Sequence, residues 1–416
     1  MDLGISERVK PLLAEVKVFI EREVIPLEEE FHSEIGNGDR WQFTDRQTEI
    51  METLKTKARD KGLWNFFLTH TEASGNLNTV EYAYLAEEMG RCQLAAEVFN
   101  CSAPDTGNME VLAKYGTEEQ KEKWLKPLLK GEIRSAFAMT EPGVASSDAT
   151  NIATSAVLDG DEWIIDGEKH YTSGAGDPRC RVMIVMVKTD PSASRHKQQS
   201  QILVPMDTEG VEVLRPMHVF SKDDAPHGHM HIRFNNVRVP KDNIILGAGR
   251  GFEISQGRLG PGRIHHCMRA IGSAEKALEL LCKRATTRVA FGKPLAQLGG
   301  NIDIIANARM QIEMGRLLTL KTAYMMDTVD IKEARIWISK IKAVILNIST
   351  KIIDDAIQIH GASGVAQDFP LAGMYMKQRS LRLADGPDEV HRMVVGRAEL
   401  KKYVNQPTKN STLSDS

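Results

Sequence analysis

The sequence Phe137-Ala-Met-Thr-Glu-Pro-Gly-Val-Ala-Ser-Ser-Asp148 lies where the pattern of the chain changes from helical to extended. An apolar run over 133–139 predicts a strand, which ends in Thr140, a Glu-Pro-Gly turn and two serines. Such a strand end gathers hydroxyl and backbone N–H groups in one small volume, where they can bind an anionic or heteroaromatic ligand. Read alone, the segment is also compatible with an ordinary hairpin turn.

The chain before this stretch has apolar residues at helical spacing, beginning with those between Val9 and Val24. Three further helix starts carry the capping-box pattern, in which two side chains three residues apart satisfy free N–H groups. The pairs are Thr44 with Gln47, Asn78 with Glu81, and Thr117 with Gln120. We therefore expect an N-terminal α-helical domain over 1–131.

Residues 132–246 have the short apolar runs and turn clusters of a β domain, which we expect to be a barrel or sandwich. Extended runs fall at 182–187, 202–204 and 231–239, and the run at 163–165 precedes an expected turn at Asp166-Gly167. From 247 to 405 helical spacing returns over 264–285, 302–327, 331–360 and 388–403, which predicts a C-terminal four-helix bundle. The fold class is thus α+β with three domains, followed by a polar tail over 406–416 that we expect to be flexible.

Composition excludes several classes of protein. The chain has 416 residues, a net charge of −3 and scattered basic residues, so nothing favours nucleic acid as a partner. Five cysteines without a C-x-x-C pair predict reduced thiols and no zinc site. No apolar run reaches the roughly 18 residues of a transmembrane helix. No targeting segment is visible, so we expect a cytoplasmic location if the source is bacterial, and a mitochondrial or peroxisomal one if it is eukaryotic.

Two further patterns are given their simpler interpretation. His227, His229 and His231 alternate along an extended segment and could together bind zinc, but no carboxylate or thiol stands at matching spacing. We expect a polar strand face and no metal. Gly247-Ala-Gly-Arg-Gly251 lacks the Lys-Ser/Thr of a phosphate-binding loop and is interpreted as a linker between strand and helix.

With these blocks in place, the chain resembles the acyl-CoA dehydrogenases over residues 5–404. The segments that carry the resemblance, in order, are Met139-Thr-Glu-Pro-Gly143, Asp166-Gly-Glu-Lys-His-Tyr-Thr-Ser-Gly174, Phe234-Asn-Asn-Val-Arg-Val-Pro240, Arg288-Val-Ala-Phe-Gly-Lys293, Gln358-Ile-His-Gly-Ala362 and Asp385-Gly-Pro-Asp-Glu389. The paired serines and the last segment look most like the branch whose members can also carry a kinase-like domain.

The resemblance implies an FAD-dependent enzyme that removes two hydrogens from a medium- or long-chain fatty acyl-CoA, giving the trans-2-enoyl-CoA. A carboxylate takes the α proton, and the β hydrogen leaves as hydride to flavin N5. Asp385 stands at the position of this base, where the family generally has glutamate, and the family's other base position aligns near Gly262, which carries no acid. Asp385 can equally be part of a helix start, because Pro387 and the acids after it favour one.

The flavin contacts that the resemblance implies fall into two groups. Those within one chain are Phe137, Met139, Thr140, Ser146, Ser147, Tyr171, Thr172, Ser173, Pro387, Asp388 and Glu389. The Thr140 hydroxyl is expected near N1 and O2, one of the paired serines at the pyrophosphate, and Ser173 where a hydroxyl donates to N5. Those that reach the FAD of a neighbouring subunit are Arg288, Phe291, Gln358, Gly361 and Ala362, which implies a homo-oligomer, usually a tetramer in this family.

Substrate contacts are expected from Ser147, Gly262, Arg263 and Gly386. Small or helix-breaking residues of the first block, Ala95, Ala96, Ala103 and Pro104, are expected around the acyl tail. Electron-transfer flavoprotein is the expected electron acceptor. Two alternatives stay open: a flavin oxidase of the same fold that resembles nitroalkane oxidase, in which an aspartate base is usual, and an acyl-CoA-binding sensor with little turnover.

Overall fold

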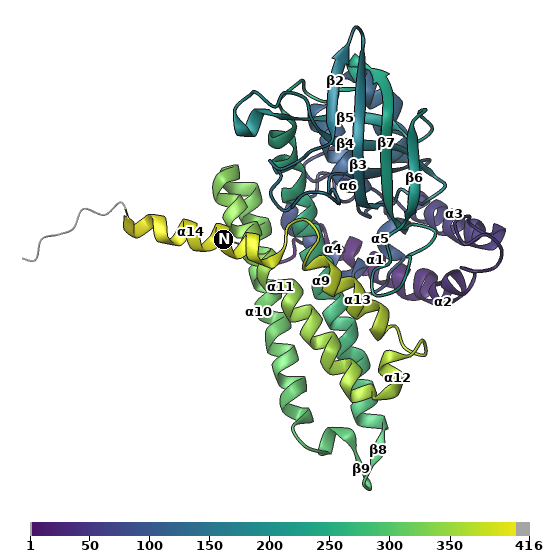
Figure 1. The fold of residues 1–416 in the computed structure, drawn as a ribbon. Coiled ribbons are helices and arrows are strands. Elements are labelled where there is room, and N and C mark those ends of the chain that lie inside the picture. Colours follow the sequence, from purple (N-terminus) through teal and green to yellow (C-terminus); the bar gives the residue numbers. More distant parts are fainter. Residues whose placement is uncertain (1, 405–416) are drawn as a thin grey trace, which may run out of the picture.

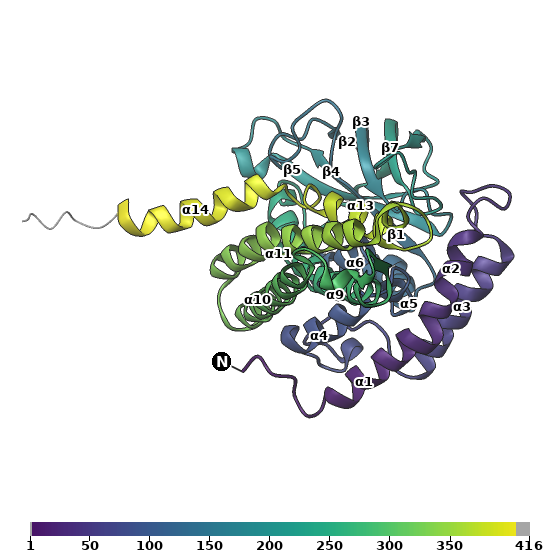
Figure 2. The same ribbon diagram turned by 90° about the horizontal axis from the view of Figure 1, so that it is seen from below.

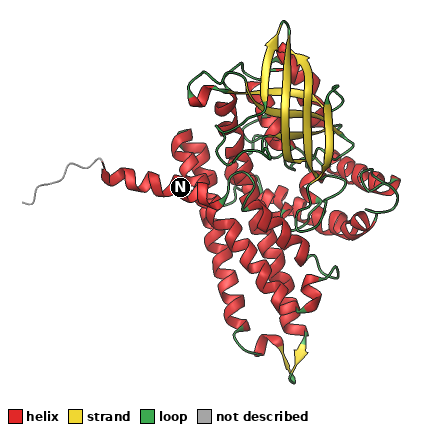
Figure 3. Ribbon diagram, in the orientation of Figure 1, coloured by secondary structure: helices red, strands yellow, loops and turns green. Residues whose placement is uncertain are grey.

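The computed structural model describes residues 2–404, in which helices are followed by a sheet and then by helices again (Figures 1 and 3). This order confirms the expected fold class. The helices of the first part are α1 Lys10–Phe19, α2 Ile25–Ser33, α3 Asp45–Asp60, α4 Thr79–Met89, α5 Ala95–Val98, α6 Asp105–Tyr115, α7 Glu118–Gln120 and α8 Lys126–Lys130. The capping boxes at Thr44, Asn78 and Thr117 are all present, and each begins a helix.

The middle part is one curled sheet of seven strands. They are β1 Arg134–Ala138, β2 Ser155–Asp159, β3 Glu162–Ser173, β4 Cys180–Lys188, β5 Gln199–Pro205, β6 Val211–Pro216 and β7 His229–Pro240. The order is β1-β4-β2-β3-β7-β6, with β5 paired to β4. β1 runs parallel to β4, so the strand that leads into Thr140 lies beside a largely buried strand of the sheet.

The prediction of a turn at Asp166-Gly167 is wrong. β3 continues through both residues, and its register against β7 shifts between Ile165 and Gly167, which marks a bulge. Gly167 has φ +144°, and a Cβ there would lie 2.7 Å from Thr154 Oγ1. An Asp-Gly pair favours positive φ in a bulge as well as in a turn, so the neighbouring strand decides between them.

The last part contains the long helices α9 Gly251–Thr287, α10 Asn301–Thr328 and α11 Ile331–His360. Shorter helices follow: α12 Ala362–Val365, α13 Leu371–Leu381 and α14 Asp388–Val404. A small hairpin, β8 Val289–Ala290 and β9 Lys293–Pro294, lies at the end of the bundle farthest from the sheet (Figure 1). α9 begins at Gly251, so the glycine-rich segment before it is a linker, as expected.

α9, α10 and α11 pack side by side, with α4 of the first part against α9 and α10 (Figure 2). α13 packs along α11, whereas α14 contacts α11 and then extends away from the body. No helix within residues 2–404 is long and apolar enough to cross a membrane. The tail expected over 406–416 lies outside the described residues.

Candidate active site

A cavity of about 2210 Å³ lies where the helices of the first part, the sheet and the C-terminal helices meet. Many of the residues expected at a flavin and substrate site line it. They are Phe137, Met139, Thr140, Ser146, Ser147, Tyr171, Ser173, Gly262, Arg263, Asp385, Gly386 and Pro387. The segment after β1, the end of β3, the first half of α9 and the turn between α13 and α14 therefore converge on one space.

Asp385 lies in that turn, with φ +55°. Arg263 Nε donates to its backbone carbonyl over 2.8 Å, and His391 Nε2 lies 3.2 Å from the same oxygen. The carboxylate Oδ2 lies 3.3 Å from His266 Nε2. A Cβ placed on Gly262 would lie 3.8 Å from Oδ2, so the two positions considered for a base are neighbours in space. Asp385 is the one that carries an acid.

The charges around Asp385 keep it ionised. Burial raises its pKa, but the hydrogen bond from His266 and the charges of Arg258 and Arg263 outweigh burial and lower the pKa below the usual range. Burial lowers the pKa of Arg258 itself to about 10, which leaves it charged at neutral pH. The Arg258 guanidinium lies 3.7 Å from the centre of the Phe137 ring. Ionisation leaves the carboxylate free to accept a proton at neutral pH, and the lowered pKa makes it a weaker base than an ordinary aspartate.

Sequence reasoning missed Arg258 and His266. Both lie on α9 with Gly262 between them, at spacings of four residues, so the three positions share one helix face. That spacing, next to a glycine already expected at the site, is the signal that could have identified them.

The turn that carries Asp385 is fixed from α11. The buried Lys342 Nζ donates to the carbonyls of Leu381 at 2.6 Å and Gly386 at 3.2 Å. Asp388, expected as a flavin contact, is buried and accepts hydrogen bonds from Arg382 Nε and Asn347 Nδ2, each at 2.9 Å. Asp388 thus begins α14 and lies outside the cavity wall, as does the exposed Glu389.

The two serines after β1 have different surroundings. Ser146 Oγ accepts the backbone N–H of Glu141 at 2.9 Å and so helps to form the turn. The buried Glu141 carboxylate accepts from Lys169 Nζ at 2.7 Å and from the backbone of Ala153 at 2.7 Å. These bonds hold the Glu-Pro-Gly turn rigidly against the sheet.

At the end of β3, Tyr171 adopts φ +53° and reaches the cavity, whereas Thr172 is fully buried and does not line it. Ser173 Oγ lies 2.8 Å from His229 Nδ1. His231 pairs instead with Glu168 at 2.8 Å, so the alternating histidines have separate partners. Within residues 2–404 no group of three His, Cys, Asp or Glu side chains could hold a metal ion.

The residues expected to reach a neighbouring subunit lie elsewhere. Arg288 follows α9, and Phe291, 94% exposed, lies at the tip of the β8–β9 hairpin. Gln358 and Gly361 lie at the end of α11, and Ala362 begins α12. Arg284 Nη2 donates to the backbone carbonyl of His360 over 3.4 Å, and this bond links the ends of α9 and α11. None of the five expected residues lines the large cavity.

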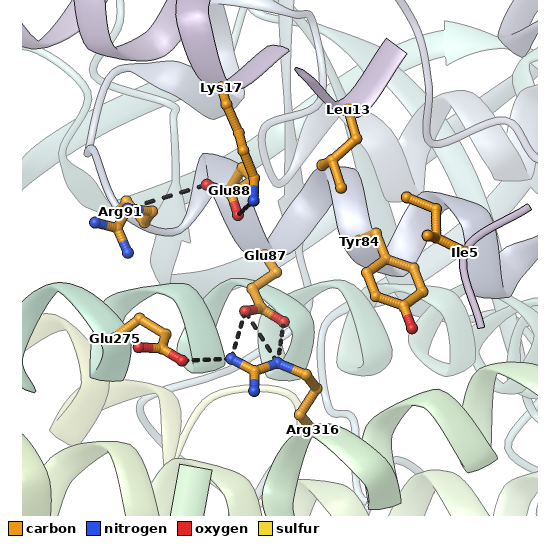
Figure 4. A pocket seen from close by; sticks show the side chains of 9 residues that line it. All are labelled: Ile5, Leu13, Lys17, Tyr84, Glu87, Glu88, Arg91, Glu275 and Arg316. Carbon is orange, nitrogen blue, oxygen red and sulfur yellow. Dashed lines mark hydrogen bonds and ion pairs between the residues drawn. The ribbon is translucent and has the colours of Figure 1, made fainter. Parts of the chain in front are cut away.

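A second cavity, of about 350 Å³, lies between α1, α4, α9 and α10 (Figure 4). Arg316 on α10 points into it between Glu87 of α4 and Glu275 of α9 and pairs with both. Its charged groups satisfy one another, and none of the expected site residues lies there.

The large cavity suits a large cofactor together with a substrate. Ligand pockets are usually about 300–1,000 Å³, and this one is more than twice that upper value. Its lining includes hydroxyl-bearing residues of the segment after β1 and of the end of β3, and also Asp385 with its cationic neighbours Arg258 and Arg263. These residues therefore fit a flavin beside an acyl thioester.

Three family models match the chain: the N-terminal domain of acyl-CoA dehydrogenase over 6–132, the middle domain over 136–237 and the C-terminal domain over 249–400. A curated "probable acyl-CoA dehydrogenase FadE2" of Mycobacterium tuberculosis is 53% identical over 354 residues, covering 85% of this chain and 86% of that protein. A solved structure of a candidate acyl-CoA dehydrogenase from Mycobacterium abscessus is 52% identical with a TM-score of 0.93, covering 96% of this chain and all of that one.

Acyl-CoA dehydrogenase family member 10 of Mus musculus is 52% identical over 403 residues, which are 96% of this chain but 37% of that protein. The chain thus spans about a third to a half of several longer curated relatives. With the three domain models in order and half of the residues identical to these relatives, the chain belongs to the acyl-CoA dehydrogenase family of FAD-dependent oxidoreductases.

Proposed function

We propose that this chain catalyses the FAD-dependent α,β-dehydrogenation of a fatty acyl-CoA to the trans-2-enoyl-CoA. The observation that carries the proposal is the ionised Asp385 carboxylate on the wall of a cavity large enough for a flavin and a thioester. Family membership supports the same reaction class.

In this proposal the Asp385 carboxylate removes the α proton, and its backbone N–H donates a hydrogen bond to the thioester oxygen. The hydrogen bonds that Arg263 and His391 make to the Asp385 carbonyl hold that peptide in place. Bound FAD would supply the chemistry of hydride acceptance at the β carbon. The hydrogen bond from His266 and the charges of Arg258 and Arg263 would keep the base ionised until the substrate arrives.

Phe137, Met139 and Thr140 would contact the flavin ring, with Tyr171 beside the ring and Ser173 at its N5 edge. Ser147 is the better candidate for the pyrophosphate, because the Ser146 hydroxyl is already engaged in the turn. Gly262 and Gly386 would leave room for the substrate, since neither carries a side chain beside Asp385.

For the acyl tail we propose a medium- or long-chain substrate. Ala96, Ala103 and Pro104 line the cavity and leave space between the first helices and α9, whereas Ala95 is packed in the N-terminal core and does not line it. Activity restricted to four-carbon substrates would contradict this part of the proposal.

We also propose a homotetramer and electron-transfer flavoprotein as acceptor. Arg288, Phe291, Gln358, Gly361 and Ala362 lie away from the cavity of their own chain, so they would contact FAD only in another copy. A guanidinium such as that of Arg288 suits a pyrophosphate, which it can bind through two hydrogen bonds.

Anaerobic titration of the FAD-loaded protein with acyl-CoAs of increasing chain length tests the proposal. Saturated acyl-CoAs should bleach the flavin absorbance, and Asp385→Asn, which keeps the shape but removes the base, should slow bleaching by about 10²–10⁴-fold. Bleaching at equal rates in both proteins would exclude Asp385 as the base. Tight acyl-CoA binding without faster reduction in the wild type would favour a sensor.

The aspartate in place of glutamate keeps the oxidase alternative open. The same titration in air separates the two enzymes. A dehydrogenase should produce little peroxide until an electron acceptor is added, whereas an oxidase should turn over with peroxide as its product.

A further inference from the structure

Three polar side chains form a row on the cavity wall next to the end of β3. Ser173 Oγ lies 2.8 Å from His229 Nδ1, at the start of β7, and His229 Nε2 lies 3.5 Å from Asp224 Oδ2. All three residues line the large cavity. Neither Asp224 nor His229 was expected at the site from the sequence.

The direction of the hydrogen bonds in this row follows from which atoms can donate. An ionised carboxylate only accepts, and the neighbouring His229 side chain is the main reason that the pKa of Asp224 lies below its usual range. A neutral imidazole carries one N–H, and the Asp224 carboxylate favours the tautomer of His229 with this N–H on Nε2. Nδ1 is then an acceptor and takes the single O–H of Ser173. The Ser173 oxygen is left with lone pairs and no proton to donate elsewhere.

We infer that Asp224 and His229 orient the Ser173 hydroxyl so that it presents an acceptor to the N5 edge of a bound flavin, and not the donor that the resemblance implies. This inference rests on the proposed function, which brings Ser173 to that edge. Oxidised flavin has only a lone pair at N5, whereas reduced flavin carries an N–H there. An acceptor at this point therefore stabilises the reduced form and raises the reduction potential. Asp224 and His229 act as positioning residues.

Other charged groups face this row, and they matter for the test. The His227 ring centre lies 6.2 Å from that of His229, at 89°, and His227 in turn faces Arg134 and Asp177. Lys377 on α13 interacts with Asp224. Removal of the Asp224 charge, acting only through space, would favour a more negative reduced flavin and raise the potential. Loss of the oriented acceptor would lower it.

The opposite signs make the reduction potential of the FAD-loaded protein a decisive measurement. Photoreduction against a reference dye at about pH 8 needs no acyl-CoA. Ser173→Ala should lower the ratio of affinities for reduced and oxidised FAD about tenfold, or ~30 mV for a two-electron couple. Asp224→Ala should lower the same ratio about threefold, or ~14 mV. In the Ser173→Ala background, Asp224→Ala should cause no further decrease in the reduction potential.

Asp223→Ala is the matched control, because Asp223 is the adjacent carboxylate but pairs with Arg40 at 2.7 Å. Its potential should stay at the wild-type value. A higher or unchanged potential in Asp224→Ala would overturn the inference, even if acyl-CoAs still bleach the wild-type flavin. A wild-type protein that binds FAD but is not reduced by any acyl-CoA would overturn the proposed function alone. Failure to bind FAD would overturn both.

Discussion

Asp385 adopts a left-handed backbone conformation, which few non-glycine residues adopt and which aspartate tolerates better than most. Such a conformation persists when the surrounding contacts impose it. Here Arg263 and His391 bond the carbonyl, and Gly386, with φ +96°, continues the turn. The direction of the carboxylate is therefore set by its own backbone as well as by His266.

Glu110 on α6 gives a prediction for the pH dependence of stability. Burial raises its pKa to about 8, and Arg258 offsets this only in part. The folded state therefore binds this proton more tightly than the unfolded state, whose pKa is near 4.5. The contribution of the protonated Glu110 carboxyl to the free energy of unfolding is complete below pH 4.5 and is lost as the pH rises through about 8.

Glu110→Gln removes this titration. The free energy of unfolding of the variant, relative to that of the wild type, should therefore rise by ~3 kcal/mol between pH 5 and pH 8.5. Urea unfolding at the two pH values measures the difference. Glu52→Gln, at an exposed position on α3, should keep a constant difference from the wild type. A constant difference for Glu110→Gln as well would mean that Glu110 is ionised in the folded protein.

The turn between α13 and α14 depends on α11, a helix that lies about forty residues earlier in the chain. Lys342 links α11 to the carbonyls of Leu381 and Gly386, on the two sides of Asp385. Burial lowers the pKa of Lys342, whereas the nearby Asp385 raises it. The lysine thus connects the position of a helix to the position of the base.

Lys342→Met keeps the length of the side chain but leaves the two carbonyls without this donor. We expect a loss of about 1–3 kcal/mol in the free energy of unfolding. Flavin reduction in a single turnover should slow about tenfold or more, because small displacements of a reacting group are costly, while the Kd for FAD changes little. Lys340→Met, on the same helix but over the Trp337 ring at 3.7 Å, should change neither.

At the level of the whole molecule, Arg316 joins the N-terminal and C-terminal parts (Figure 4). It pairs with Glu87 of α4 at 2.8 Å and with Glu275 of α9, and its side chain is 19% exposed. Burial raises the pKa of Glu87, which shows how much this carboxylate depends on its partner. The cavity between β3, α9 and α13 keeps its shape only if these parts stay together.

Arg316→Ala should therefore lower the free energy of unfolding by about 3–5 kcal/mol, because a largely buried carboxylate loses its partner. Arg309→Ala removes the other arginine that pairs with Glu275, but that side chain is 46% exposed and should cost less than about 1 kcal/mol. Urea unfolding of the two variants measures the difference. Equal losses would contradict a special role for Arg316.

Features that depend on neighbours along the chain could be predicted from the amino-acid sequence. The capping boxes at Thr44, Asn78 and Thr117 use bonds within three residues, and they could be read directly. The bounds of α11 were predicted from its apolar spacing, and Asp330 caps its start through the backbone N–H groups of Lys332 and Glu333. Motifs likewise identified Asp385 and the segment around Thr140, which line one cavity.

Contacts between charges and strands that are distant along the chain could not be predicted from the sequence and became clear from the folded structure. The bulge at Gly167 depends on pairing with β7, and the ionisation of Asp385 depends on Arg258 and His266 from another helix. The row from Asp224 to Ser173 joins residues fifty-one positions apart. Local sequence patterns do not predict such contacts, because electrostatic and hydrogen-bond energies depend on separation in space and not on separation along the chain.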